Sequence, residues 1–146
     1  MDAGQLAQAH AAFPELAPLA AQLRAGWGRP VIRVGQVELH LRIGDVADTL
    51  PCWRGCADAW FLDGFSPAKN PQMWDEAVMA QVGRHTAPGG TFATYTAAGG
   101  VRRALTDAGF AVERLPGFGR KRHMSVGRMP DQSGVSPGAP GPSPAA

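Results

Sequence analysis

The stretch that decides the fold runs from Ala57 to Trp74 and reads ADAWFLDGFSPAKNPQMW. Its first six residues form a short and mostly apolar run, which is typical of a strand buried on both faces in a parallel sheet. Asp63 and Gly64 end that strand, and turn-forming residues follow up to Pro71. Asn70 before Pro71 predicts the N-cap and the first position of a helix. The stretch therefore predicts a strand, a stiff loop and a helix.

Strands and helices also alternate on both sides of this unit, as the spacing of apolar residues, glycines and prolines indicates. Upstream we expect two helices between Met1 and about Trp27, broken at Pro14, and a hairpin from Val31 to Ile43 with one wet face. Downstream we expect a strand at Thr91–Thr96, a helix opened by Gly99 and closed by Gly109, and strands at Phe110–Leu115 and Met124–Met129. This order predicts an α/β sandwich with a mostly parallel sheet and a C-terminal antiparallel hairpin.

The composition is that of one ordinary domain. The chain has 146 residues, 45% of them hydrophobic, and a formal net charge of +2. That charge is too small to identify a nucleic-acid-binding protein by itself. No apolar run approaches the roughly 20 residues of a membrane span, no signal segment opens the chain, and two cysteines cannot form a disulfide scaffold. We therefore expect a cytoplasmic protein.

The end of the chain differs from the rest in composition. Residues 130–146 are mostly Pro, Gly, Ser and Ala. Such a segment has almost nothing to bury, so we expect it to be disordered. Residues 1–129 then form the folded part of the chain.

Asp63 is the sharpest candidate for a functional residue. It lies where a buried parallel strand is predicted to end, and the carboxyl ends of such strands are where ligands bind in open α/β sheets. Gly64 permits close approach to the backbone, and two prolines stiffen the loop that carries Lys69 and Asn70. A turn or helix-capping role for Asp63 is the alternative.

Two other groups of residues have both a functional and a purely structural interpretation. Five basic residues and no acidic ones lie between Arg114 and Arg128, which suits either contact with nucleic-acid phosphates or a solvated hairpin loop. Cys52 and Cys56 are spaced C-x3-C, but a zinc site would need two more ligands at suitable spacing. Free thiols, and no metal site, are the expected interpretation.

Three blocks of the sequence together resemble the MnmC-like tRNA methyltransferases. The first block is FLDGFSPAKNPQMW at Phe61–Trp74, the second is PGGTFATYTAAG at Pro88–Gly99, and the third is GFGRKR at Gly117–Arg122. The resemblance covers about Met1 to Met129 and is looser upstream. Gly100 and His123 depart from the family pattern, where Phe and Glu are expected.

The resemblance implies a class I, Rossmann-like fold that uses S-adenosylmethionine (SAM) to methylate the aminomethyl group of a 2-thiouridine at the tRNA wobble position. Asp63 would face the transferring methyl group and orient the substrate amine. Asp45 would contact the adenine side of SAM from a strand end, and Gly64 would lie beside the cofactor. Phe65 would pack on the base or the cofactor. Besides Phe65, the residues expected to contact the substrate or to fix the loop around it are Lys69, Asn70, Arg120, Lys121 and Arg122.

The sequence shows no pattern for the N-terminal elements of the class I fold. That fold opens with a strand and a glycine-rich turn that cradles SAM, and no such pair precedes the first expected helix. The chain is then the C-terminal two-thirds of a methyltransferase domain, N-terminally truncated and lacking the first β-α-β unit. Activity would require the SAM-binding half from elsewhere, such as a separate polypeptide. The alternative is an inactive remnant that retains RNA binding. Bifunctional relatives add a flavin oxidase domain; here we expect no FAD.

Overall fold

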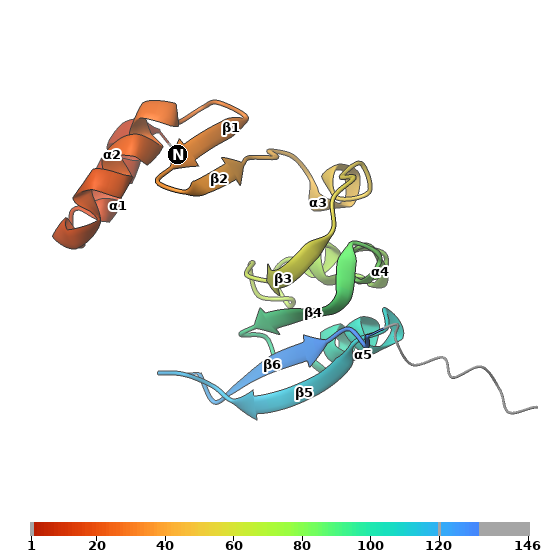
Figure 1. Ribbon diagram of the computed structural model, residues 1–146. Coiled ribbons are helices and arrows are strands. Elements are labelled where there is room, and N and C mark those ends of the chain that lie inside the picture. Colours follow the sequence, from red (N-terminus) through yellow and green to blue (C-terminus); the bar gives the residue numbers. More distant parts are fainter. Residues whose placement is uncertain (1, 120, 132–146) are drawn as a thin grey trace, which may run out of the picture. The chain divides into compact units, whose positions relative to one another are not determined.

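The structure, a computed structural model, describes residues 2–119 and 121–131 (Figure 1). These residues divide into two compact units, which meet in the sequence between Gly44 and Asp45. Each unit has elements and buried side chains of its own. The second unit carries the Asp63 loop.

The first unit begins with a pair of helices, as the sequence predicts. Helix α1 spans Ala3–His10 and is capped by Asp2, whose side chain accepts a hydrogen bond from the backbone N–H of Gln5. The short 3-10 helix η1 spans Pro14–Leu16 and leads directly into α2 at Ala17–Gly26. Proline cannot continue the first helix, which explains the break. The buried apolar residues of this unit are Leu6, Ala20 and Ile32.

The hairpin of the first unit is shorter than predicted. Strands β1 (Val31–Val34) and β2 (Val37–His40) pair antiparallel, and Gly35 takes a φ of 59° in the turn. The N–H of Leu41 still bonds to the carbonyl of Pro30, but Pro30 has no N–H with which to extend the ladder. The predicted strand up to Ile43 is therefore wrong at its end, and Ile43 is 92% exposed.

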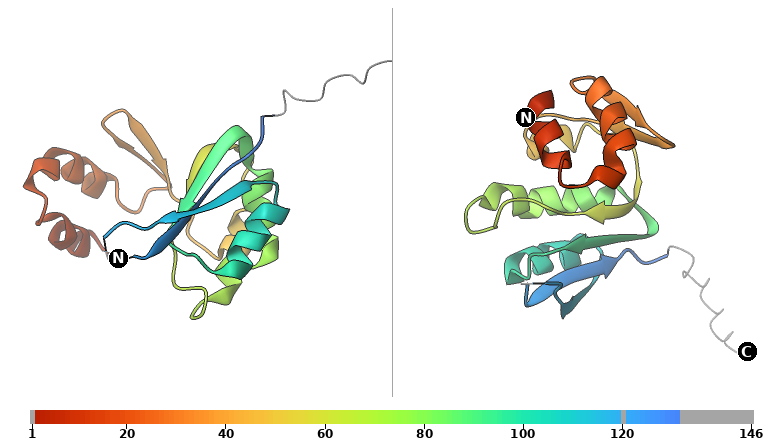
Figure 2. Two further views of the ribbon diagram at one scale, coloured as in Figure 1. Left: turned by 90° about the horizontal axis from the view of Figure 1, so that it is seen from below. Right: turned by 90° about the vertical axis from the view of Figure 1, so that its left-hand side faces the viewer.

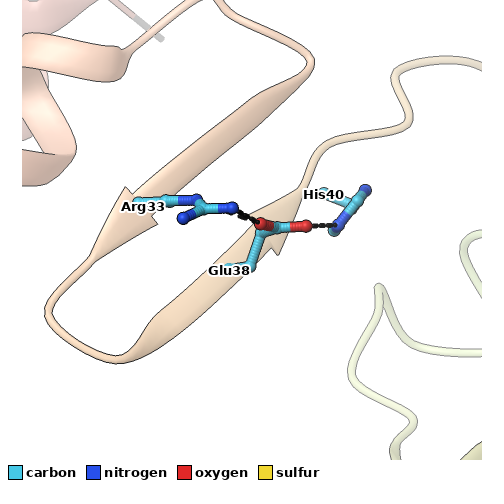
Figure 3. Close-up of polar contacts among 3 residues, drawn as sticks. All are labelled: Arg33, Glu38 and His40. Atoms are coloured by element: carbon cyan, nitrogen blue, oxygen red, sulfur yellow. Dashed lines mark hydrogen bonds and ion pairs between the residues drawn. The ribbon is translucent and has the colours of Figure 1, made fainter.

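Glu38 joins the two hairpin strands on their polar side (Figure 3). Its carboxylate lies 2.7 Å from Nε2 of His40 and accepts from Arg33, whose Nη2 is 2.9 Å away. The hydrogen bond with His40 and then the charge of Arg33 hold the pKa of Glu38 below its ordinary value. The three side chains are solvated, so the group fixes the local geometry of the hairpin more than it stabilises the fold.

The second unit is built on a mixed four-stranded sheet. Its strands are β3 (Ala57–Phe61), β4 (Thr86–Thr94), β5 (Ala111–Pro116) and β6 (His123–Arg128), in the spatial order β3-β4-β6-β5. Only β3 and β4 are parallel, while β6 runs antiparallel to both of its neighbours. The predicted C-terminal hairpin is confirmed. The expectation of a mostly parallel sheet is wrong for the described residues, and the β1–β2 hairpin forms a separate sheet.

Short helices connect these strands. Helix α3 spans Val46–Thr49, the 3-10 helix η2 spans Pro71–Trp74, α4 spans Glu76–Arg84 and α5 spans Gly99–Asp107. The helix expected to start at Pro71 starts later, because Asp75 is its N-cap and accepts from the N–H of Val78 at 2.8 Å. Asn70 precedes only the 3-10 turn and makes no side-chain cap bond.

The core of the second unit lies on one face of its sheet. Helices α4 and α5 lie on the same side of the sheet (Figure 2), and their apolar residues pack with Phe92 and Phe110. Among the described residues of this unit, no helix covers the other face. Ala59 is exposed there and Phe61 is 86% exposed, so the expectation that this strand is buried on both faces is wrong for this unit.

Candidate functional site

A polar pocket opens where the two parallel strands end. Its volume is about 300 Å³, and it lies against the carboxyl ends of β3 and β4 and the loop between β5 and β6. This is the edge at which open α/β sheets bind ligands. The polar and aromatic residues that line it are Asp63, Ser66, Trp74, Thr94, Tyr95, Thr96 and Lys121.

Asp63 lies at the mouth of this pocket, two residues beyond the last residue of β3. The N–H of Leu62 still bonds to the carbonyl of Ala93 at 2.9 Å, so the chain leaves the sheet only at Asp63. The Asp63 side chain is exposed. Gly64 follows in close contact with the Met73 side chain, since an added Cβ would lie 3.0 Å from the methyl carbon of Met73. A carboxylate is thus presented to the pocket from a fixed strand end.

A hydrogen bond from a tryptophan anchors the loop after Asp63. The indole N–H of buried Trp74 donates to the carbonyl of Phe65 at 2.7 Å. The N–H groups of Lys69 and Asn70 both bond to the carbonyl of Ser66, at 2.8 and 3.0 Å. The loop therefore has a defined backbone shape before any ligand binds.

Three predicted site residues lie on this loop outside the pocket wall. Phe65 is 74% exposed and Lys69 is exposed, so both are free to contact a large substrate. Asn70 is half-buried, and its Oδ1 is buried without a hydrogen-bond partner among the described residues. Their roles toward a substrate stay predictions.

Tyr95 is the residue of this site that the sequence reasoning missed. It follows β4 directly, close to where Asp63 follows β3 after one intervening residue, and it is half-exposed in the pocket. The backbone beside it is fixed, because the hydroxyl of buried Ser125 donates to the carbonyl of Thr96 at 2.9 Å. Its position after the second buried strand was the signal that could have found it.

The basic loop between β5 and β6 reaches the same pocket through one residue. Lys121 lines the pocket, and Arg122 is exposed beside it. The N–H of Gly117 bonds to the carbonyl of Arg122 at 3.1 Å, which closes the loop at its base. Arg120 lies outside the described residues. The structure thus brings Lys121, Asp63 and Gly64 together.

Asp45 does not line this pocket and does not end a strand, although the next residue, Val46, lines an adjoining hollow together with Asp63 and Gly64. It is the N-cap of α3, and its carboxylate accepts from the N–H of Ala47 at 2.9 Å. The strand end predicted for Asp45 is therefore wrong, since β2 stops at His40. Of the two residues assigned to SAM, Gly64 lines the pocket and Asp45 is engaged by a helix N-terminus.

No group of three or more metal-ligating side chains occurs in the part of the chain that the structure describes. Cys52 and Cys56 are free and exposed. No helix of residues 2–119 and 121–131 is long and apolar enough to cross a membrane.

The structure defines an α/β domain with a polar pocket at the carboxyl ends of its parallel strands. The chain belongs to a family of S-adenosyl-L-methionine-dependent methyltransferases, whose family model matches residues 10–130.

Its relatives include the tRNA 5-methylaminomethyl-2-thiouridine biosynthesis bifunctional proteins MnmC. The protein from Chromobacterium violaceum is 52% identical over 129 aligned positions, covering 84% of this chain and 20% of that protein. The protein from Aromatoleum aromaticum is 47% identical over 150 aligned positions, covering 97% of this chain and 22% of that protein. The chain spans about a fifth of the length of these relatives. The predicted resemblance to the MnmC-like methyltransferases is confirmed.

A solved structure agrees with the fold. The crystal structure of MNMC2 from Aquifex aeolicus aligns with a TM-score of 0.67 and 26% sequence identity. The alignment covers 77% of this chain and 36% of that one.

Proposed function

We propose that this chain forms the substrate side of a methyltransferase that acts on the aminomethyl group of a 2-thiouridine at the tRNA wobble position. The observation that carries the proposal is the exposed Asp63 carboxylate at the mouth of a polar pocket at the carboxyl ends of two parallel strands. The names of the bifunctional relatives support the choice of substrate, and family membership supports SAM as the methyl donor.

Asp63 has a direct chemical task in this reaction. An amine is a nucleophile only through an unprotonated nitrogen, and a carboxylate within hydrogen-bond reach can accept its proton. The same hydrogen bond points the nitrogen lone pair, and such positioning supplies much of the rate of a transfer reaction. The bond from Trp74 to the carbonyl of Phe65 keeps the loop in place for this task.

The SAM-binding half comes, in this proposal, from another polypeptide. Two features of the second unit support it. Among the described strands, β3 pairs only with β4, so its other edge presents backbone groups to which a further strand can bond. Beside that edge lies the uncovered face of the sheet, with an apolar hollow of about 420 Å³ that includes Phe61 and Val126. The absence of FAD stays a prediction.

A chimera tests the proposal. The part of this chain that aligns with the Chromobacterium violaceum relative, 84% of the chain at 52% identity, replaces the matching segment of that relative. We expect the folded chimera to methylate tRNA that carries the aminomethyl group. Asp63→Asn should then lower kcat by about 10²-fold, the lower end of what general acid–base catalysis contributes. As a control, Asp107→Asn, at the end of α5, should leave kcat unchanged. An active chimera that tolerates Asp63→Asn would contradict the role of Asp63.

Binding of RNA without catalysis is the second candidate function. Phe118 is 82% exposed, and Lys121 and Arg122 are exposed on the same loop, so an aromatic ring and cations are available to an RNA strand. A folded but inactive chimera, together with tRNA binding by the chain that weakens as salt rises, would select this function.

A further inference from the structure

We propose that the pocket at the ends of β3 and β4 holds one nucleotide, with its base stacked on Tyr95, its aminomethyl group at Asp63 and its phosphate at Lys121. This inference rests on the proposed function. It states which part of the RNA is recognised and adds Tyr95 as the residue that contacts the base.

The size of the pocket suits one nucleotide. Its volume of about 300 Å³ is at the lower end of the roughly 300–1,000 Å³ of small-molecule pockets. Enzymes that modify a base inside RNA take that base out of its stack and enclose it. The pocket has room for a base with its sugar but not for a folded segment of RNA.

Tyr95 has the properties of a stacking platform. Its ring is half-exposed although the residues before and after it are tied to the sheet. The N–H of Thr96 bonds to Oγ1 of Thr94 at 3.3 Å, and the hydroxyl of Ser125 bonds to the carbonyl of Thr96. Tyr95 also lines a second hollow beside Asp63, together with Met124. An aromatic ring held in place beside a carboxylate offers a flat surface to a base whose amine reaches that carboxylate.

The charges of the pocket set the direction in which the nucleotide enters. A phosphate is repelled by the carboxylate of Asp63 and attracted by the ammonium group of Lys121, while a substrate amine has the opposite preferences. Both residues line the same pocket, and they come from loops that follow different strands. The base end of the nucleotide therefore points toward Asp63 and the phosphate end toward the loop between β5 and β6.

The chain offers a direct probe, because Tyr95 is its only tyrosine. Incorporation of 3-fluorotyrosine then reports on this ring alone by fluorine NMR. We expect the resonance to move on titration with 5-aminomethyl-2-thiouridine 5′-monophosphate. The corresponding nucleoside should bind more weakly, and inorganic phosphate alone should leave the resonance in place.

Variants separate the three contacts, with affinities measured by calorimetry on the unlabelled chain. Tyr95→Phe should retain affinity, and Tyr95→Ala should lose about tenfold or more, as expected for loss of one base–aromatic stack. Lys121→Ala should abolish the difference between nucleotide and nucleoside. Asp63→Asn should abolish the preference for the aminomethyl nucleotide over uridine 5′-monophosphate. Arg84→Ala, an exposed cation at the end of α4, should change none of these.

Three results would overturn the inference. They are absence of nucleotide binding by the folded chain, binding that leaves the fluorine resonance unmoved, and an equal movement with inorganic phosphate, which would mean an anion site only. None of these measurements requires SAM. An inactive chimera combined with a moving resonance would therefore reject the proposed function and keep the nucleotide site, and the reverse pair of results would do the opposite.

Discussion

Two indole groups, of buried Trp74 and half-buried Trp60, make hydrogen bonds at opposite ends of the parallel strand pair. At the carboxyl end, Trp74 donates to the carbonyl of Phe65 in the Asp63 loop at 2.7 Å. Near the amino end of β4, Trp60 donates to Oγ1 of Thr86 at 2.9 Å. The two bonds have similar chemistry, but only the first holds a loop that lines the pocket. This difference allows stability and site geometry to be separated by mutation.

We predict that Trp74→Phe loosens the loop over residues 63–70. The phenyl ring keeps most of the apolar contact but leaves the carbonyl of Phe65 without its donor, so the free energy of unfolding should fall by about 1–3 kcal/mol. Hydrogen exchange followed by mass spectrometry should show faster exchange in residues 63–70. Trp60→Phe is the matched control, and it should lower stability without changing exchange in this loop. Equal exchange of the loop in the two variants would contradict the anchoring role of Trp74.

At the scale of elements, α4 and α5 contain glycines with opposite surroundings. A Cβ on Gly83 of α4 would lie 2.9 Å from Cβ of Ala108, just after α5, and closer still to the Ala108 carbonyl oxygen. A Cβ on Gly100, in the first turn of α5, would meet nothing within 4 Å. Gly83 is therefore required by packing, whereas Gly100 is not.

Two glycine substitutions should change stability in opposite directions. Gly83→Ala gains helix propensity but overpacks the contact with Ala108, and we expect a net loss of about 1–2 kcal/mol in the free energy of unfolding. Gly100→Ala should raise the same quantity by up to about 1 kcal/mol, because only the propensity changes. Urea denaturation of the two variants measures both effects. A stabilising Gly83→Ala would mean that the helix can move away from Ala108 at little cost.

The sequence predicted elements whose signals are local, and it missed features that depend on neighbours. Helix α5 and the β5–β6 hairpin follow from apolar spacing and from flanking glycines, and both are confirmed. The exposure of Phe61 could not be predicted in this way. An apolar strand has the same sequence pattern whether or not a second layer of the protein covers its outer face.

The candidate site shows the same division. Asp63 is predicted because ligands bind at the carboxyl ends of parallel strands, whereas Tyr95 is not, because tyrosine is also a common strand residue. Tyr95 could be an ordinary strand residue or a residue of the site. Only its position in the folded chain, in the lining of the pocket, favours the second interpretation.

At the scale of the whole molecule, the buried cluster of the second unit is internal to it. The cluster runs from Trp74 to Phe110, and the partly buried residues packed against it begin at Val46. The pocket and its loops belong to the same unit. The pocket that we assign to the substrate is therefore formed within this unit alone.

The positions of the two residues assigned to SAM predict how the chain responds to SAM alone. Gly64 is the only residue assigned to the cofactor that lines the pocket, and the Asp45 carboxylate already accepts from the N–H of Ala47. Calorimetric titration of the 146-residue chain with SAM should therefore give no saturable heat at micromolar concentrations. Circular dichroism and a cooperative thermal transition would establish that the sample is folded.

Binding of one SAM molecule per chain would contradict this prediction. It would mean that the residues of this chain form a cofactor site by themselves and that no second polypeptide is required. Failure to bind SAM, in a sample whose fluorine-labelled Tyr95 still responds to the nucleotide, would locate the deficit on the cofactor side. In that case adding the SAM-binding half, as the chimera does, is what should restore methyl transfer, because the substrate side needs no change.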